Sequence, residues 1–248
     1  MTTKKRNSKY KTPNTKYKLP NTKHKTPNLH FLIIGFGRFG QLALKRLKRK
    51  FPSDKFTVVD KRPDALAQIQ DESVEQLLMG GISALMVKST EMKASDWIIP
   101  AIPVHVAYEW MALCITETHD IQTMEVPREI HEQLPNQIRG ENNAIYTSIA
   151  DFICPDDCSE PETICTCTGK PRSIVLNEAL ESLKHQLFQP IVIYSRQLAP
   201  GVGGYTISDL ESMMIKVTKT SGPFLLATAC KCHGVIHAFR LIPSDETI

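Results

Sequence analysis

A regular pattern of apolar and polar positions begins at His30. The run 30–34 has the length and apolar character of a buried strand, and residues 38–50 then place apolar side chains at helical spacing. A second apolar run follows at 56–59, and a short helix is expected from 63 to about 70. This alternation predicts the start of a parallel β-sheet with helices packed on it.

The rest of the chain continues the alternation of strands and helices. A strand at 97–99 and a helix at 104–116 precede a polar stretch, 119–143, which we expect to be a linker. Beyond the linker, the expected elements are a helix at 174–187, strands at 191–194, 224–227 and 235–241, and a glycine loop at 200–204. Thr206 is expected to cap one further helix, with Asp209 as the acid of a capping box.

We therefore predict an α/β protein of two domains. A Rossmann-type parallel-sheet domain, residues 29–145, is followed by a smaller, cysteine-bearing α/β domain, residues 146–248. The segment 1–28 is different, because it repeats a seven-residue unit with one proline in each copy. Proline interrupts helices and the copies contain few apolar side chains, so we predict a disordered basic tail.

Charge is distributed unevenly along the chain. The 248 residues include 30 Lys and Arg against 26 Asp and Glu, and nine of the bases lie in residues 1–30, which contain no acid. The remainder is acidic overall, with 21 bases against 26 acids, which argues against a specific nucleic-acid partner. No run of about 18 apolar residues is present, so no membrane insertion is expected. Without an apolar segment behind the basic N-terminus, a cytoplasmic location is expected, where thiols stay reduced.

The clearest chemical signal is a G-x-G-x-x-G motif at residues 35–40, between a predicted strand and a predicted helix. In such a turn Gly35 bends the chain, Gly37 lets a pyrophosphate approach the backbone, and Gly40 lets the helix pack closely on the strand. The amides at the helix N-terminus favour an anion. The candidate dinucleotide-binding residues are Gly35, Phe36, Gly37, Arg38, Phe39, Gly40, Asp60, Lys61 and Arg62.

The choice between NAD and NADP depends on the end of the second strand. Asp60 follows Gly40 by 20 residues, where an acid binds the ribose hydroxyls of an adenosine. Its charge repels a 2′-phosphate and favours NAD, whereas Lys61 and Arg62 leave NADP open. The alternative is a glycine turn that binds no nucleotide.

The segments LIIGFGRFG and VVDKRPDAL resemble the nucleotide-binding domain of the TrkA/RCK type, found in potassium-transport regulators. The resemblance covers about residues 29–70. It implies a Rossmann fold, dinucleotide binding and a sensing role at a dimeric interface, which makes a homodimer one possible assembly. The family usually has Gly-Asp-Ala after its third strand, and the sequence Met-Gly-Gly-Ile at 79–82 lacks that acid.

A second candidate site follows the apolar run at 97–99. The segment 96–105 resembles the fourth strand of many Rossmann dehydrogenases, where such a run ends in a proline beside the nicotinamide. Since ligands bind beyond the strand ends, we expect His105 to donate or accept a proton there, with Glu109 one helical turn away. The alternative is that Pro103 ends the strand and His105 packs or caps the helix.

Six of the seven cysteines fall into two groups, and thiolates are ligands for zinc or an iron–sulfur cluster. We expect the two groups to meet and hold one metal, although their spacing matches neither zinc ribbons nor ferredoxins. Buried structural thiols, a disulfide or a redox dithiol are the alternatives. Cys114, alone on a helix, is expected in the core. The metal candidates are Cys154, Cys158, Cys165, Cys167, Cys230, Cys232 and His233.

These patterns together predict a cytosolic NAD(H)-binding protein that couples the nucleotide to redox chemistry or redox sensing. Its further ligand is an unidentified small-molecule substrate or effector, and if it is an enzyme it is an NAD(P)-dependent oxidoreductase. One alternative is a non-catalytic regulator that senses nucleotides, like the TrkA/RCK subunits. Another is a structural zinc protein on a Rossmann scaffold.

Overall fold

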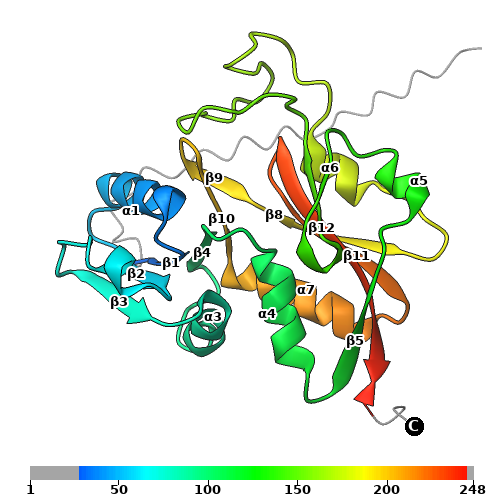
Figure 1. Cartoon of the computed structure of the whole chain (residues 1–248), viewed down its shortest axis with the longest axis horizontal. Helices are drawn as coiled ribbons and strands as arrows, with labels where there is room; N and C mark the ends of the chain where they lie inside the picture. The colour runs from blue at the N-terminus through cyan, green and yellow to red at the C-terminus, as the bar shows by residue number, and fades with distance from the viewer. Residues whose placement is uncertain (1–27, 245–248) are drawn as a thin grey trace, which may run out of the picture.

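The computed structural model describes residues 28–244 (Figure 1). The predicted disordered tail lies outside the described residues apart from Asn28, so that prediction is not tested. No helix within the described range is both long and apolar enough to cross a membrane.

The N-terminal half forms strand–helix repeats, as the apolar pattern predicts. Its elements are β1 (His30–Ile34), α1 (Arg38–Lys50), β2 (Lys55–Asp60), α2 (Pro63–Leu66), β3 (Val74–Leu78), α3 (Gly81–Ser89), β4 (Trp97–Pro100) and α4 (Val106–Ile115). The helix expected from 63 to about 70 ends at Leu66, however, and one further strand and helix over 74–89 were not predicted from the sequence. Strand β1 pairs in parallel with β2 and β4, and β2 pairs in parallel with β3. The prediction of a Rossmann-type parallel sheet is confirmed.

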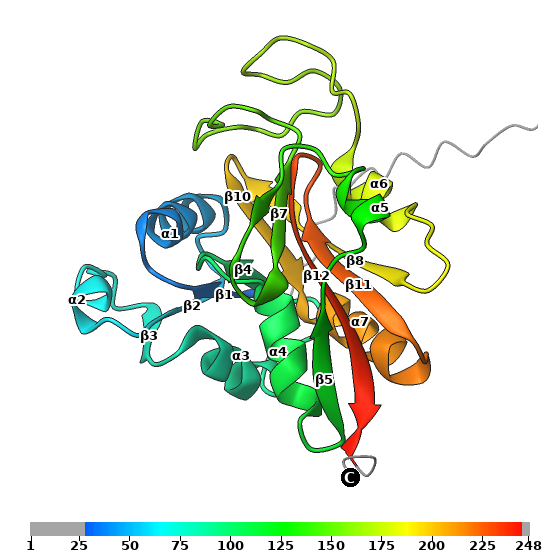
Figure 2. The same ribbon diagram turned by 45° about the vertical axis from the view of Figure 1, so that its right-hand side comes forward.

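The C-terminal half builds most of a second sheet. Its elements are β5 (His119–Met124), α5 (Arg128–His131), β6 (Ile138–Arg139), the 3₁₀ helix η1 (Glu141–Asn143), β7 (Ile145–Ser148), α6 (Leu176–Glu181), β8 (Gln189–Tyr194), β9 (Arg196–Ala199), β10 (Val202–Thr206), α7 (Ile207–Lys219), β11 (Pro223–Ala229) and β12 (His233–Pro243). The second sheet has the order β6-β7-β12-β11-β8, with β5 also paired to β12 (Figure 2). Strand β8 lies parallel to β11, and β12 is antiparallel to its neighbours.

Three expectations for this half need correction. The stretch 119–143 is not a plain linker, because β5 pairs along six residues with β12, and its half-buried side chains alternate with exposed ones from His119 to Thr123. The helix expected at 174–187 ends at Glu181, and the amides of residues 187 and 188 instead donate to the His185 ring. Part of the expected glycine loop is strand β10, which joins the first sheet beside β4.

The two sheets share strands from both halves of the sequence. The first sheet has the order β3-β2-β1-β4-β10-β9, so a hairpin from the C-terminal half extends it. Conversely, β5 and β6 precede residue 145 yet belong to the second sheet. The domain boundary at residue 145 remains a prediction, and the sheets cross it in both directions.

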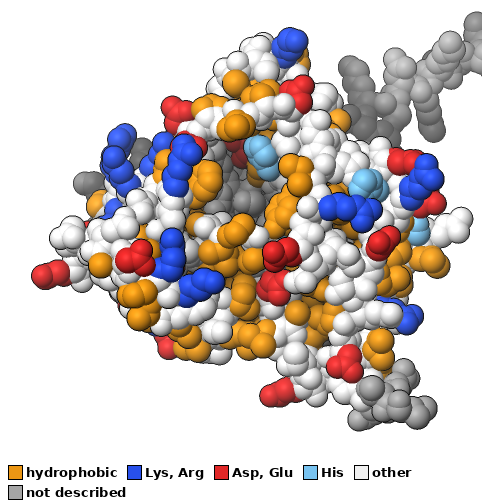
Figure 3. All heavy atoms as spheres, in the orientation of Figure 1, with side chains coloured by type: hydrophobic (Ala, Val, Ile, Leu, Met, Phe, Trp, Pro, Cys, Tyr) orange, Lys and Arg blue, Asp and Glu red, His pale blue; other side chains and the backbone are white. Residues whose placement is uncertain are grey.

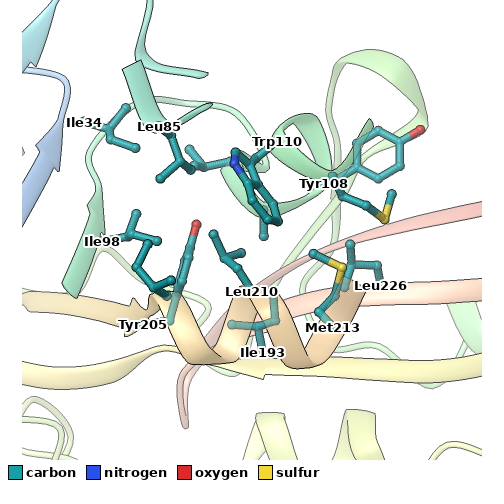
Figure 4. Close-up of a cluster of buried hydrophobic side chains, with 14 of the residues drawn as sticks. Ile34, Leu85, Ile98, Tyr108, Trp110, Ile193, Tyr205, Leu210, Met213 and Leu226 are labelled. Atoms are coloured by element: carbon teal, nitrogen blue, oxygen red, sulfur yellow. The ribbon is translucent and has the colours of Figure 1, made fainter. Parts of the chain in front are cut away.

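One large hydrophobic cluster joins the sheets (Figure 4). It contains Ile34 and Ile98 from the first sheet, Leu226 from the second, and Leu210 and Met213 from α7. The predicted capping box starts α7, since Thr206 accepts the Asp209 amide and the Asp209 carboxylate accepts the Thr206 amide at 2.8 Å. The helix is thereby fixed between the sheets at its first turn.

Candidate functional site

The glycine turn after β1 has a backbone that depends on glycine at two positions. Gly35 has φ +96°, and its amide donates to the Val59 carbonyl at 2.7 Å. A Cβ at Gly35 would lie 2.8 Å from the Ala101 carbonyl oxygen, and a Cβ at Gly40 would lie 2.0 Å from the Gly35 oxygen. Both glycines therefore serve the close approach of β1, α1 and the segment after β4.

Gly37 has a different role, because its conformation does not require glycine. It is the N-cap of α1 with φ −75°, and a Cβ there would meet no atom within 4 Å. The first amides of α1 have no partner within the helix, so donors and the positive end of the helix dipole face this open space. The donor set and the space suit a pyrophosphate.

Asp60, at the end of β2, is 8% exposed and its carboxylate is fully engaged. One oxygen accepts the Phe36 amide at 2.7 Å and the Arg62 guanidinium at 3.1 Å. The other accepts the amide and the Nε of Arg62 at 3.0 and 3.1 Å. The Arg62 side chain lowers the pKa of Asp60 to about 2, so the group is an anion at neutral pH. A carboxylate accepts about four hydrogen bonds, and Phe36 and Arg62 already supply four. A ribose hydroxyl would therefore have to replace the Arg62 side chain.

The remaining motif side chains point in different directions. Phe36 is buried in the core of the first sheet, whereas Phe39 and Lys61 are exposed. Arg38 is also exposed and lies at the first turn of α1, where it forms an ion pair with Asp156.

A cavity of about 1010 Å³ adjoins this first turn of α1. Arg38 and Phe39 line one side, and Gly201 to Gly203 of the β9–β10 hairpin line another. Figure 3 views the face on which the surface is hollowed between these elements. Because β10 runs antiparallel to β4, its first residues lie at the carboxyl end of β4, the edge at which parallel sheets bind ligands.

All six cysteines of the two predicted groups, and His233, line this one cavity. The first group lies on the loop 149–175, and Cys230 and Cys232 lie at the turn between β11 and β12. Several sulfurs accept backbone amides: Cys158 from Glu160 at 3.4 Å, and Cys230 from Cys232 at 3.4 Å. Such N–H···S bonds stabilise a thiolate.

Burial opposes thiolate formation at three of these six cysteines. It raises the pKa of Cys154 and of Cys232, and raises the pKa of Cys230 to about 12. The amides and hydroxyl of the following residues lower the pKa of Cys165. All seven cysteines are free thiols. Within the described part of the chain, no three His, Cys, Asp or Glu side chains are arranged to hold a metal, so the geometry does not support the expected zinc or iron–sulfur site.

The cysteine loop is attached to α1 and to the β9–β10 hairpin. Arg46 donates to the carbonyl oxygens of Asp156 and Pro200 at 2.6 and 2.5 Å. The Cys158 carbonyl accepts the amide of Gly201 at 2.9 Å. Sequence reasoning did not identify the contact between Arg46 and Asp156, because these residues are 110 positions apart and no local spacing indicates the contact.

His105 does not face the cavity. It is 2% exposed, and its Nδ1 lies 2.9 Å from Nδ1 of His237 on β12. Its Nε2 lies 3.0 Å from the hydroxyl of Thr228 on β11. Burial lowers the pKa of His105 well below its usual value and lowers that of His237 to about 4, so both rings are neutral. Glu109 is half-buried one turn further along α4, and catalytic roles for either residue remain predictions.

The Thr228–His105–His237 contact joins the second sheet to the N-terminus of α4. The His237 ring also stacks on Tyr108 with centroids 3.9 Å apart, and its Nε2 is buried without a hydrogen-bond partner. The second sheet therefore covers the position that resembles a dehydrogenase site.

Comparison with known proteins divides the chain into two overlapping parts. A family model described as "TrkA-N domain" matches residues 31–130, and the AF_1314_C model, described as "Uncharacterized protein, C-terminal domain", matches residues 96–242. A protein of Archaeoglobus fulgidus described as "Uncharacterized protein" is 29% identical over 224 residues, which cover 84% of this chain and 98% of that relative. No solved structure matches the chain. The N-terminal part is thus a TrkA-N domain of the Rossmann type, and the chain, more than half of which matches the second model, belongs to the AF_1314_C family.

Proposed function

We propose that this protein binds NAD(H) at the glycine turn and the N-terminus of α1. The observation that carries the proposal is the combination of unpartnered amides with the open space beside Gly37, in a turn where Gly35 and Gly40 are required by close packing. The TrkA-N match supports the same ligand class, and Asp60 favours NAD over NADP.

The direct test is calorimetric titration of the protein and of Gly37→Val with NADH. A Cβ at Gly37 meets no protein atom within 4 Å, so the variant keeps its fold while its side chain fills the pyrophosphate position. Affinity should fall by at least about tenfold, or about 1.4 kcal/mol. Arg49→Val places the same side chain on an exposed position of α1 and should bind normally. Equal affinity in Gly37→Val and Arg49→Val would refute the site.

We further propose that nucleotide binding is coupled to thiol redox chemistry or sensing, in a cytoplasmic protein whose cysteines stay reduced. The support is the position of six thiols around the cavity that adjoins α1. The alternative is a regulator without turnover, which the TrkA-N match favours equally. Redox coupling would transfer two electrons and one proton from a pair of thiols to NAD⁺, which forms a disulfide, NADH and a released proton. The number of free thiols, counted after incubation with NAD⁺, separates the two proposals, because only redox coupling lowers that number. The homodimer expected from the TrkA/RCK resemblance is checked by mass in solution.

A second candidate is binding of zinc in the thiol cavity. The specific observation is that five thiols line one cavity, although no three are gathered closely enough within the described residues to hold a metal: Cys154, Cys158, Cys165, Cys167 and Cys232. Binding therefore requires the irregular loop 149–175 to draw together around the ion, which would link metal binding to folding of the loop.

Metal content per chain, measured after incubation with zinc and desalting, tests this candidate. Cys158→Ser and Cys232→Ser should each lose the metal, because the two cysteine groups contribute jointly. Cys114→Ser, which removes a thiol on α4 away from the cavity, is the matched control. Retention of zinc in either cavity variant, or no zinc in the unaltered protein, excludes a shared site.

A further inference from the structure

Arg38 connects the proposed nucleotide site to the cysteine cavity. Its backbone belongs to the G-x-G-x-x-G motif and the first turn of α1, where the proposed pyrophosphate binds. Its guanidinium pairs with the carboxylate of Asp156, which lies between Cys154 and Cys158. Arg38 is 75% exposed and Asp156 is 29% exposed, so the pair lies at the mouth of the cavity.

A dinucleotide phosphate and the Asp156 carboxylate are competing anions for Arg38. We propose that a phosphate group bound at α1 takes Arg38 from Asp156 and loosens the turn Cys154–Cys158, so that nucleotide occupancy controls access to the cavity thiols. The inference rests on the proposed nucleotide site and adds its regulation. Guanidinium groups bind phosphate in a bidentate geometry that a single carboxylate contact does not match.

The other contacts of the turn limit its movement to loosening. Arg46 binds the carbonyl of Asp156, and Gln197 and Gly201 both donate to the carbonyl of Cys158. These bonds involve the backbone and do not depend on the Asp156 carboxylate. The loss of the Arg38 contact therefore leaves the turn attached by its carbonyls, while the side chains at 154 and 158 gain freedom.

The exposure of the Arg38–Asp156 ion pair limits how strongly nucleotide binding can change access to the thiols. A solvent-exposed pair contributes at most about fivefold to an equilibrium constant. Coupling between two sites is reciprocal. Bound nucleotide should therefore loosen the turn by a certain factor, and removal of the Asp156 charge should strengthen nucleotide binding by the same factor. Both factors should lie between about twofold and fivefold.

The test measures alkylation rates of Cys154 and Cys158 by mass spectrometry, with and without NADH or inorganic pyrophosphate. Both ligands should accelerate alkylation of the unaltered protein by about two- to fivefold. Asp156→Asn should react at the faster rate without ligand, respond little to it, and bind NADH correspondingly tighter. Asp157→Asn, an exposed neighbour of the same chemistry, is the matched control and should behave like the unaltered protein.

The outcomes separate this inference from the proposed function. If NADH binds but alkylation is unchanged or slower, or if Asp156→Asn matches Asp157→Asn in both measurements, the coupling is absent although the nucleotide site stands. If NADH binds to no variant, the proposed function fails and the coupling fails with it. An acceleration by NADH alone, without pyrophosphate, would show that the phosphate does not act through Arg38.

Discussion

Substitution of Gly40 by alanine is the sharpest test of the packing at the glycine turn. A Cβ on Gly40 would lie 2.0 Å from the oxygen and 2.9 Å from the carbon of Gly35. Both atoms are backbone, so no side-chain rotation relieves the contact. Since real Cβ contacts essentially never fall under 3.0 Å, α1 would have to move away from β1 by about 1 Å.

The expected cost is the difference between two effects. Overpacking of this kind costs about 1–3 kcal/mol, and the higher helix propensity of alanine returns up to about 1 kcal/mol. A net loss of about 2 kcal/mol is expected, which corresponds to about 4–8 °C in Tm for a domain of this size. The measurement is urea unfolding, in which the midpoint should fall while the slope stays constant.

Gly37→Ala is the control within the same turn. Its Cβ meets no atom, so its cost is limited to the weaker N-cap, under about 1 kcal/mol. The two variants should therefore separate, with Gly40→Ala losing stability and Gly37→Ala losing mainly NADH affinity. A Gly40→Ala protein as stable as Gly37→Ala would show that the turn does not press helix and strand together as described.

Three further outcomes follow from individual contacts. Arg62→Ala should tighten NAD binding about two- to fivefold in calorimetry, because it frees lone pairs of Asp60 for the ribose; weaker binding would mean that Arg62 itself holds the ligand. Burial lowers the pKa of His105 and of His237 in the folded protein. As the pH falls, both rings are therefore protonated in the unfolded chain before they are protonated in the folded protein. Stability should therefore fall as pH drops from about 6.5 towards 4, by up to about 1.4 kcal/mol per pH unit for each ring, and urea midpoints of His237→Gln should show a shallower fall. Thr206→Ala should cost about 1 kcal/mol in the same assay through loss of the α7 cap.

The parts of the fold that the sequence predicts are those determined by local rules. The glycine turn, Asp60 and the capping box at Thr206 depend on residues a few positions apart or on a strand–helix unit of known geometry. Strands β8 and β11 are parallel, and the glycine loop that follows β8 in the chain and Cys230 after β11 both line the cavity.

The errors in prediction have a common physical origin in contacts between distant segments. The sequence predicts a loop at β10 because glycines have low strand propensity. In the structure Gly204 packs where a Cβ would lie 2.7 Å from the Ile98 carbonyl oxygen, so glycine is what allows β10 to lie beside β4. The sequence also predicts that His105 lies in a ligand crevice, because a strand that ends in a proline turn is a signal that can be read from neighbouring residues. Its burial depends on β11 and β12, which follow more than 110 residues later. The sequence pattern around His105 therefore gives no indication that the second sheet covers it.

The overlap of the two family matches has a structural explanation at β4. The AF_1314_C match begins at Asp96, directly before the strand that pairs with β1 on one side and with β10 on the other. The buried Asp96 carboxylate accepts the amide of His30 at the start of β1, and its carbonyl accepts the amide of Ile207 at the start of α7. One residue thus fixes the first strand of the TrkA-N part and the first turn of a C-terminal helix. The C-terminal region is therefore built onto the first sheet through β4, which pairs with strands of both parts, rather than joined to it by a linker alone. The cysteine loop in turn contacts the first turn of α1 through Asp156 and Arg38.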